Sequence, residues 1–452
     1  MVAVITDFFK KSIVQDIIDG INDSNDNYYI GVGRSEYWDS ADNPPTPVND
    51  MRDIREFRQS MQAVKKILST SFAVARVNWT TGTTYSQYDD TQVGHPSPNY
   101  YVLNQNHQVY VCLRTGRDAT GATVPSTVEP TNSNNHAFET ADGYVWKFIY
   151  TISALSANYF LSANYMPVTY IAGELDSDAT GIQLKQKEIQ DTAIGGMITS
   201  IVVTNGGSGY TSKPTVTITG NSTDSDFNVT AFIDSSTNTV SKIEFDNDSS
   251  TLSYPTGFDF AEVTITGGGG SGAQARPILS DHNGIGHDAR SDLKANGLML
   301  HTKTAGNLDD FIILQDFRQI GIIKNPKKGD GSDSDLTAET ANALKSMRID
   351  PITLAFNSDN VIIGGTTGVK AWVDEVDSDI LYYHQNDSTG YGSFQVGETL
   401  TESDGTGDGT IAQLIDSSEV DPFSGEVLYI DNRTAVARTA NQTEDIKIIL
   451  QL

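Results

Sequence analysis

The feature that most constrains the fold is a short stretch, 144–150, in which large side chains alternate with a period of two. Successive side chains of a β-strand point to opposite faces, so one face here would carry four aromatic rings. These are Tyr144, Trp146, Phe148 and Tyr150, and the other face would carry Val145, Lys147 and Ile149. An aromatic face of this size needs a second layer of protein over it. The stretch therefore predicts a packed sandwich rather than a single open sheet.

Other apolar runs have the length and composition of strands. They lie at 28–33, 74–79, 100–103, 109–113, 297–303, 311–314 and 316–326. The spacing of apolar residues predicts two N-terminal helices, at 7–21 and, after a cap at Asn49 or Asp50, at 51–67. Two further helical stretches are expected near 286–295 and 336–347. We therefore predict a mainly β protein whose β-sandwich core carries a few helices in long excursions.

Two glycine-rich regions interrupt this core. The first, 194–283, contains an internal repeat, in which 198–210 and 214–220 are echoed at 240–245, 254–255 and 263–267. The second, 353–422, carries strand-like runs at 361–363, 369–373, 380–383 and 410–415. Period-two strands separated by glycine turns predict two small all-β inserted modules. The core segments would then be 1–193, 284–352 and 423–452.

The last stretch, 425–452, holds two apolar runs, 427–430 and 446–450, joined by a polar link. A free chain end normally frays, so an apolar run at the end predicts a strand that is held in a sheet. We expect this strand to pair with its neighbour in the chain. Together the two runs would close the same sandwich that 144–150 helps to build.

The charge of the chain argues against nucleic acid as a direct partner. Its formal net charge is -28, from 30 Lys and Arg against 58 Asp and Glu, and this opposes binding to a polyanion. The acidic residues are scattered singly, which is typical of a solvated surface. No apolar run approaches the roughly 18 residues that a membrane-spanning helix needs. The N-terminus lacks the pattern of a signal peptide, so we expect a protein that is used without secretion.

Residues able to carry chemistry are few. Cys112 is the only cysteine and lies in an apolar run, so we expect a buried, inert thiol rather than a nucleophile. Three histidines and two aspartates form the one group of metal-ligand types, but their spacing fits no zinc motif, so we expect each imidazole to hydrogen-bond locally or to face solvent. They are His282, His287 and His301, with Asp281 and Asp288. The run 267–272 is interpreted as a turn rather than a phosphate-binding loop.

Two acidic loops and four tryptophans leave alternatives open. The loops 330–335 and 404–408 could hold a hard cation through carboxylate oxygens, but neither has the glycine and glutamate of a helix-flanked calcium loop. Trp38, Trp79, Trp146 and Trp372 could form a sugar platform, although a buried aromatic core explains them with fewer assumptions. A pair of carboxylates for glycoside cleavage stays possible in so acidic a chain. No catalytic, cofactor-binding or metal-binding residue is therefore assigned.

Five motifs in order give the chain a resemblance to a known family. They are GRSEYW at 33–38, VYVCL at 109–113, DGYVW at 142–146, FRQIGIIKNP at 317–326, and GEVLYIDNR at 425–433 with QTEDIKIIL at 442–450. Together they resemble the baseplate wedge subunit of T-even-like contractile-tailed phages, the eighth-gene product family. The resemblance covers about 1–193, 284–335 and 423–452. The two modules lie outside it and resemble the β insertions of marine cyanophage tail proteins.

The resemblance implies a structural protein without enzymatic activity or cofactor. It implies a homodimer in the virion, assembled in the host cytoplasm, that contacts other wedge proteins of the tail baseplate. Such a subunit would take part in the baseplate rearrangement that triggers sheath contraction, and would come near the host surface without inserting into a membrane. The alternative is a tail fibre or receptor-binding protein that recognises glycans.

Overall fold

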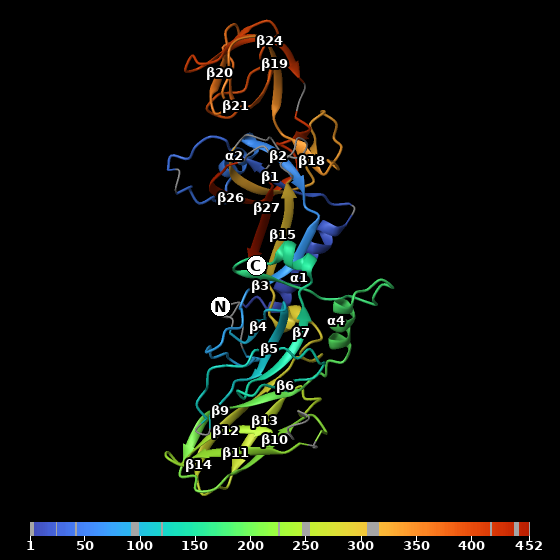
Figure 1. Cartoon of the computed structure of the whole chain (residues 1–452), viewed down its shortest axis with the longest axis vertical. Helices are drawn as coiled ribbons and strands as arrows, with labels where there is room; N and C mark the ends of the chain where they lie inside the picture. The colour runs from blue at the N-terminus through green and yellow to red at the C-terminus, as the bar shows by residue number, and fades with distance from the viewer. Residues whose placement is uncertain are drawn as a thin grey trace. The chain divides into compact units, whose positions relative to one another are not determined.

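The computed structural model describes residues 4–23, 25–40, 43–91, 99–118, 121–224, 227–245, 254–304, 316–415, 418–437 and 443–451. The described chain is mainly β, which confirms the predicted fold class (Figure 1). It divides into two compact units. Unit 1 comprises Met1–Gln15, Ser71–Met299 and Ile449–Leu452, and unit 2 comprises Asp16–Thr70 and Leu300–Ile448. The expected strand at 311–314 lies outside the described residues.

The aromatic stretch forms the strand β7 (Val145–Thr151) in unit 1. Its antiparallel sheet has the order β4 (Tyr101–Leu103), β5 (Gln108–Arg114), β7 and β6 (Phe138–Glu139). Tyr144, Trp146 and Phe148 pack in one buried cluster with Cys112 of β5, as predicted.

Tyr150 does not share this face, because β7 carries a bulge. Val109 pairs with Tyr150, whereas the next residue of β5, Tyr110, pairs with Phe148. Neighbouring residues of β5 point to opposite faces, so their partners Tyr150 and Phe148 must do the same. The Tyr150 hydroxyl instead donates a hydrogen bond to the carbonyl of Pro167, 2.7 Å away.

The first glycine-rich region is a two-layer β module within unit 1. Its strands are β9 (Ile198–Ser208), β10 (Thr215–Gly220), β11 (Val229–Asp234), β12 (Thr239–Phe245), β13 (Ala261–Thr266) and β14 (Ser271–Leu279). The two copies of the repeat pair with each other, since β9 pairs with β12 and β10 pairs with β13. Apolar residues from both sheets form one cluster between them. Gly267, Gly268 and Gly269, all with positive φ, form the turn between β13 and β14, which confirms the predicted turn.

The helices are α1 (Asp7–Asn22), α2 (Met51–Gln59), α3 (Ala154–Phe160), α4 (Gly181–Asp191) and α5 (Ala289–Asp292). The Asp50 carboxylate caps α2 by accepting the N–H of Asp53 at 2.9 Å, as predicted. The helix does not continue to 67, however, because β2 (Met61–Lys66) begins directly after it. Nearly every residue of β2 is buried, so its sequence shows no alternation that would have identified a strand.

Unit 2 contains a five-stranded antiparallel sheet. Its order is β18 (Thr340–Asn342), β2, β1 (Tyr28–Gly33), β16 (Phe317–Lys324) and β26 (Glu426–Val436). Gly31 and Gly321 face each other across β1 and β16, and a Cβ on Gly321 would overlap the ring of Phe57. The two glycines thus let α2 approach the centre of the sheet. The predicted helix near 336–347 is wrong, because β18 and the first residues of β19 occupy this stretch.

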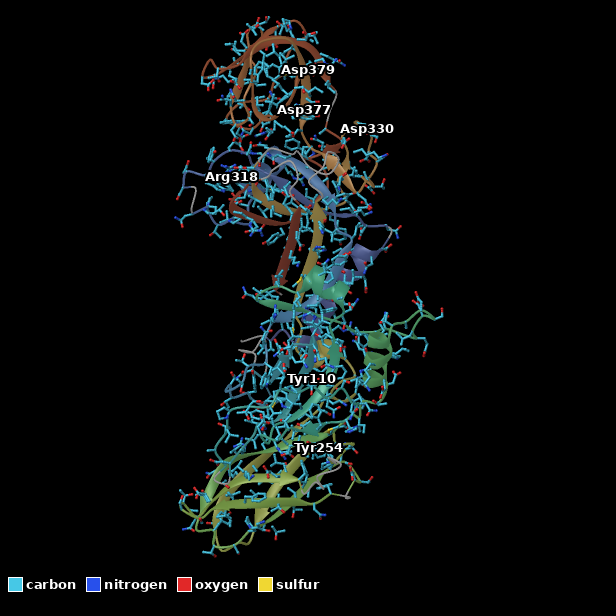
Figure 2. The ribbon with its side chains drawn as sticks, viewed as in Figure 1. Tyr110, Tyr254, Arg318, Asp330, Asp377 and Asp379 are labelled. Atoms are coloured by element: carbon cyan, nitrogen blue, oxygen red, sulfur yellow. The ribbon has the colours of Figure 1, made fainter. Side chains whose placement is uncertain are left out.

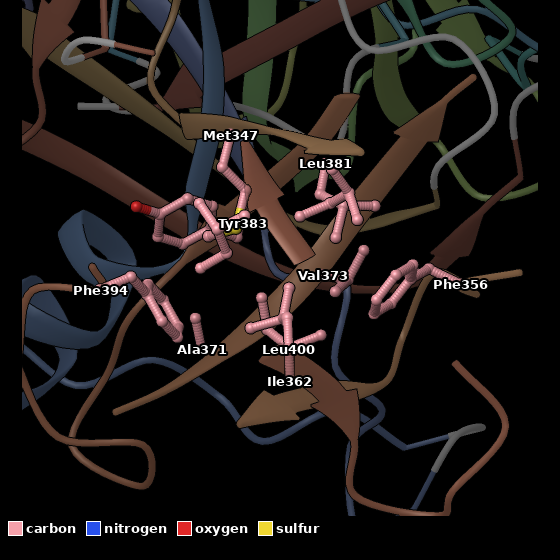
Figure 3. Close-up of a cluster of buried hydrophobic side chains, with 11 residues drawn as sticks. Met347, Phe356, Ile362, Ala371, Val373, Leu381, Tyr383, Phe394 and Leu400 are labelled. Carbon is pink, nitrogen blue, oxygen red and sulfur yellow. The ribbon is translucent and has the colours of Figure 1, made fainter. Parts of the chain in front are cut away.

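A closed six-stranded barrel completes unit 2. The order around the barrel is β19 (Lys345–Leu354), β22 (Ile380–His384), β21 (Lys370–Asp377), β20 (Val361–Gly364), β23 (Thr399–Glu402) and β24 (Asp408–Ile415). Figure 3 shows its apolar core, in which Met347, Val373, Leu381 and Leu400 are each fully buried. Strands β17 (Lys327–Lys328) and β25 (Val420–Asp421) pair with each other outside the barrel.

The two C-terminal runs are strands, but they do not pair with each other as expected. Strand β26 pairs with β16, whereas β27 (Glu444–Gln451) lies next to β15 (Gly297–Thr304) in a sheet that continues to β3 (Ser69–Ala75) and β8 (Tyr165–Val168). Neither run joins the sheet of β7, and β26 belongs to unit 2 whereas β7 belongs to unit 1, so the predicted common sandwich is wrong. The sequence of an apolar run predicts that it forms a strand, but not which strand it pairs with.

Candidate functional site

The loop that follows β1 brings charged side chains against the barrel of unit 2. Gly33 must be a glycine, because a Cβ there would overlap the carbonyl oxygen of Ser60. Arg34 then adopts a left-handed conformation, with φ of 65°, which an L-residue adopts at a cost of about 1–2 kcal/mol. Its N–H donates to the Ser60 carbonyl at 2.9 Å. This turn directs Ser35 and Glu36 toward barrel strands β21 and β22.

At the centre of this contact, the His384 imidazole lies between two carboxylates. Its Nδ1 is 2.6 Å from Asp374 Oδ2, and its Nε2 is 3.1 Å from Glu36 Oε1. A carboxylate only accepts hydrogen bonds, so both ring nitrogens must donate, and the ring is an imidazolium. Asp374 is completely buried and His384 is 5% exposed. Glu36, His384 and Asp374 therefore form a buried ion triad that joins the loop to the barrel.

The pKa values agree with this charge assignment. Burial alone would lower the pKa of His384, but the charges and hydrogen bonds of Asp374 and Glu36 outweigh burial and raise this pKa to about 10. Burial would raise the pKa of Glu36, but hydrogen bonding and attraction to His384, helped by Arg34, lower it to about 2. His384 and Glu36 are therefore both charged throughout the neutral range.

Hydrogen bonds from uncharged donors complete the arrangement. Asp374 Oδ1 accepts from the Ser35 hydroxyl at 2.9 Å and from Gln62 Nε2 at 3.3 Å. Asn386 Nδ2 donates to Glu36 Oε1 at 2.6 Å. We call Ser35, Glu36, Asp374, His384 and Asn386 the junction network. It ties the loop after β1 to two barrel strands at a fixed position.

Arginines hold the loop from its other side. Arg318 of β16, labelled in Figure 2, is 2% exposed and donates to the Ser35 carbonyl, and its guanidinium stacks on Tyr37 at 4.2 Å. The Arg34 guanidinium stacks on Trp38 at 3.8 Å. The Trp38 indole N–H donates to a carbonyl of β26 at 2.8 Å. The loop is therefore fixed by the five-stranded sheet on one side and by the barrel on the other.

The junction network is poorly suited to catalysis by its histidine. Both imidazole nitrogens carry protons that are already donated to carboxylates, and the high pKa keeps them there at neutral pH. A general base needs a free nitrogen and a pKa near the working pH. The arrangement can instead hold the loop after β1 and the barrel in one relative position, since buried ion pairs favour one geometry strongly over others.

An open cleft of about 300 Å³ lies beside the junction network. Its lining includes Arg34, Glu36, Gln59, Trp372 and Asp387. Arg55 and Gln59 of α2 donate to the Asp387 carboxylate at 2.7 and 3.1 Å, respectively, which adds a second set of contacts between α2 and the barrel.

Unit 1 holds a different charged cluster, around α5. Asp288 forms ion pairs with Lys11 of α1 at 3.1 Å and with Arg290 at 2.8 Å. Nearby, Asp292 is fully buried and accepts the N–H of Gly286 at 2.8 Å. Burial raises the pKa of Asp292 well above its usual value, so the protonated form of this carboxyl is favoured over a wider pH range than in a solvent-exposed aspartate. Burial likewise lowers the pKa of Lys147 on β7 to about 8.

The histidines considered from the sequence do not form one site. His282 is exposed, with Asp259 as its neighbour at 3.5 Å, and Asp288 is paired with Lys11 and Arg290. His301 belongs to unit 2, where its Nε2 is 2.7 Å from Asp445. Within the described ranges, no three His, Cys, Asp or Glu side chains are grouped as metal ligands would be.

The acidic loops make contacts of their own. Asp330 accepts the N–H of Ser332 at 2.8 Å, and Asp335 pairs with Lys327 at 2.7 Å. Asp404 accepts from Thr406 and Asn360. These carboxylates are thus used in turns and surface ion pairs.

The remaining sequence candidates have structural surroundings. Cys112 is completely buried, and burial raises its pKa far above the usual value, as expected for an inert thiol. Trp79 and Trp146 belong to the aromatic cluster of unit 1, whereas Trp38 and Trp372 belong to unit 2. Trp146 is completely buried, so the four tryptophans do not make one sugar platform. No described helix is both long and apolar enough to cross a membrane.

The junction network was missed in the sequence analysis. Its members Glu36 and His384 are 348 residues apart, and neither lies in a recognisable catalytic or metal-binding pattern. The one available signal was the motif at 33–38, in which a serine and a glutamate follow an arginine. No known protein-family model matches the sequence, and a search of curated proteins likewise gave no match.

Proposed function

We propose that the chain is a structural wedge subunit of a contractile-tail baseplate, as its resemblance to the phage family implies. In this role it is a homodimeric scaffold that contacts other wedge proteins and moves with them when the sheath contracts. It acts through its shape and contacts rather than through catalysis.

The observation that carries the proposal is the way the five resembling motifs come together. GRSEYW leaves β1, FRQIGIIKNP forms β16, and GEVLYIDNR enters β26, and these three strands are neighbours in one sheet. VYVCL and DGYVW meet where Cys112 pairs with Trp146. QTEDIKIIL lies apart from these, in β27 of another sheet. Short motifs that matched by chance would be scattered, whereas the other motifs form two contiguous structural frameworks.

The inserted regions support a scaffold role as well. The module at 194–283 and the barrel each have an apolar cluster of their own. A small domain with its own core can be added at a loop with little cost to the core that carries it, because loop-closure entropy grows slowly with length. Such modules suit added contacts with neighbouring subunits.

Locating the protein in the particle tests the proposal. A density map of whole virions carrying this chain should place it in the baseplate wedge, as two copies side by side. In isolation, the solution mass should be that of a dimer. Deleting 196–279 should leave dimerisation intact and weaken one wedge contact. A position in a peripheral fibre, together with binding to host glycans, would favour the receptor-binding alternative instead.

A further inference from the structure

The barrel and the five-stranded sheet of unit 2 have separate apolar cores. The core of the barrel consists of residues between Met347 and Ile411. The core of the sheet combines α2, β1, β2 and β16 with residues such as Leu336 and Val420, which flank the barrel in sequence. Neither of these two clusters includes a residue of the other. The barrel therefore does not need the sheet to bury its apolar residues.

The contacts described between the two parts are polar. The junction network joins the loop after β1 to β21 and β22, Gln62 reaches Asp374, and Arg55 and Gln59 reach Asp387. Polar contacts exchange readily for contacts with water, so their net contribution to stability is modest compared with apolar burial. This junction can therefore open without unfolding the parts that it joins.

The closed junction also carries two unsatisfied polar atoms. Arg34 Nε and Glu36 Oε2 are buried and have no hydrogen-bond partner among the described residues. An unpaired buried polar atom is costly, and water would satisfy both atoms if the junction opened. The left-handed Arg34 adds backbone strain in the same loop. The ion triad outweighs these costs and keeps the junction closed. The closed and open states of the junction are therefore closer in free energy than they would be if every buried polar atom had a partner.

We propose that the barrel is a separable body, held against the five-stranded sheet by the junction network, which releases as a unit when a competing contact replaces that network. The inference rests on the contacts of this chain and holds whether or not the protein belongs to a baseplate. In a wedge subunit, it would let the barrel change position while both cores stay folded.

Hydrogen exchange on the full-length protein tests this directly. Glu36→Ala changes a residue of the loop and removes the hydrogen-bond acceptor of His384 and Asn386. No barrel residue is substituted. We expect amides of 34–36 and 386–388 to exchange about tenfold to a hundredfold faster, since a hydrogen bond to a charged group is lost. Amides of the barrel core, such as Met347, Leu381 and Ile411, should keep wild-type protection.

Two further variants calibrate the result. Ser35→Ala removes one hydrogen bond to Asp374 but no charged group, and should give a smaller acceleration at the same amides. Arg55→Ala removes an ion pair whose side chains are both about half exposed, and should change little. If Glu36→Ala accelerates the barrel core and the junction together, the barrel is not separable. If it accelerates neither, the junction network does not hold the barrel.

Discussion

The buried imidazolium makes His384→Gln the most informative substitution in unit 2. Glutamine retains one hydrogen bond but loses the positive charge between Asp374 and Glu36. Breaking a buried ion pair by removing one partner typically costs about 3–5 kcal/mol, because the other charge stays buried and uncompensated. Asp374 keeps its hydrogen bonds from Ser35 and Gln62. We therefore expect a loss near the lower end, about 3 kcal/mol at pH 7.

The raised pKa of His384 determines how its contribution to stability changes with pH. The pKa of His384 is about 10 when folded, against its ordinary value of 6.5. A histidine with a raised pKa contributes stability that is fully present below pH 6.5 and is lost as the pH rises to about 10. At about 1.4 kcal/mol per pKa unit, this contribution is on the order of 5 kcal/mol. Glu36 shares the same interaction, so its lowered pKa is not a separate contribution.

Urea unfolding at a series of pH values measures this contribution. The free energy of unfolding of the wild type minus that of His384→Gln should be largest at pH 6 and should shrink steadily toward pH 10. The subtraction removes the titration of groups that both proteins share. Asp374→Asn combined with His384→Gln should recover part of the loss, since the carboxylate of Asp374, which is completely buried, is then removed together with its partner. A difference that stays constant from pH 6 to pH 10 would refute the imidazolium assignment.

Three further predictions concern single residues. Gly321→Ala should destabilise unit 2 by about 1–3 kcal/mol in chemical denaturation, because the new methyl group would overlap the Phe57 ring, whereas Gly181→Ala, with open space around it, should not. Cys112 should react with a thiol reagent only after denaturation, and reaction of the native protein would contradict its burial. Asp292→Asn should leave stability unchanged near pH 4 and raise it at pH 8 in thermal unfolding. A carboxyl with a raised pKa lowers stability as the pH rises through its ordinary range, and asparagine cannot ionise; equal stability at pH 8 would contradict this.

The sequence predicts strands well where one face is apolar or where the run ends at clear turns. Strands β1, β5, β7 and β16 fall within two residues of their expected positions. The failures occur where tertiary contacts override the local pattern. Strand β2 is buried on both faces, so Met61 and Val64 gave a helix-like spacing that its pairing with β1 overrules.

The partners of each strand were harder to predict than the strands. The bulge in β7 turned Tyr150 away from the aromatic cluster, and the end of the chain joined β15 instead of β26. Nothing within a single strand encodes these choices, because pairing depends on residues far away in sequence. The junction network has the same origin, since its charges meet only after the barrel has closed and the loop after β1 has turned.

The polar composition of the junction can be understood by comparing it with an apolar contact in the same place. An apolar surface on the barrel would add stability in proportion to its area, but many orientations would bury it about equally well. The ion triad fixes one orientation, because an imidazolium displaced from either carboxylate leaves a buried charge without a partner. Part of its stabilisation is offset, since Arg34 Nε and Glu36 Oε2 have no hydrogen-bond partner among the described residues. A protein whose parts must hold a defined position and later leave it needs a contact that fixes one orientation and consists of polar groups that water can also satisfy.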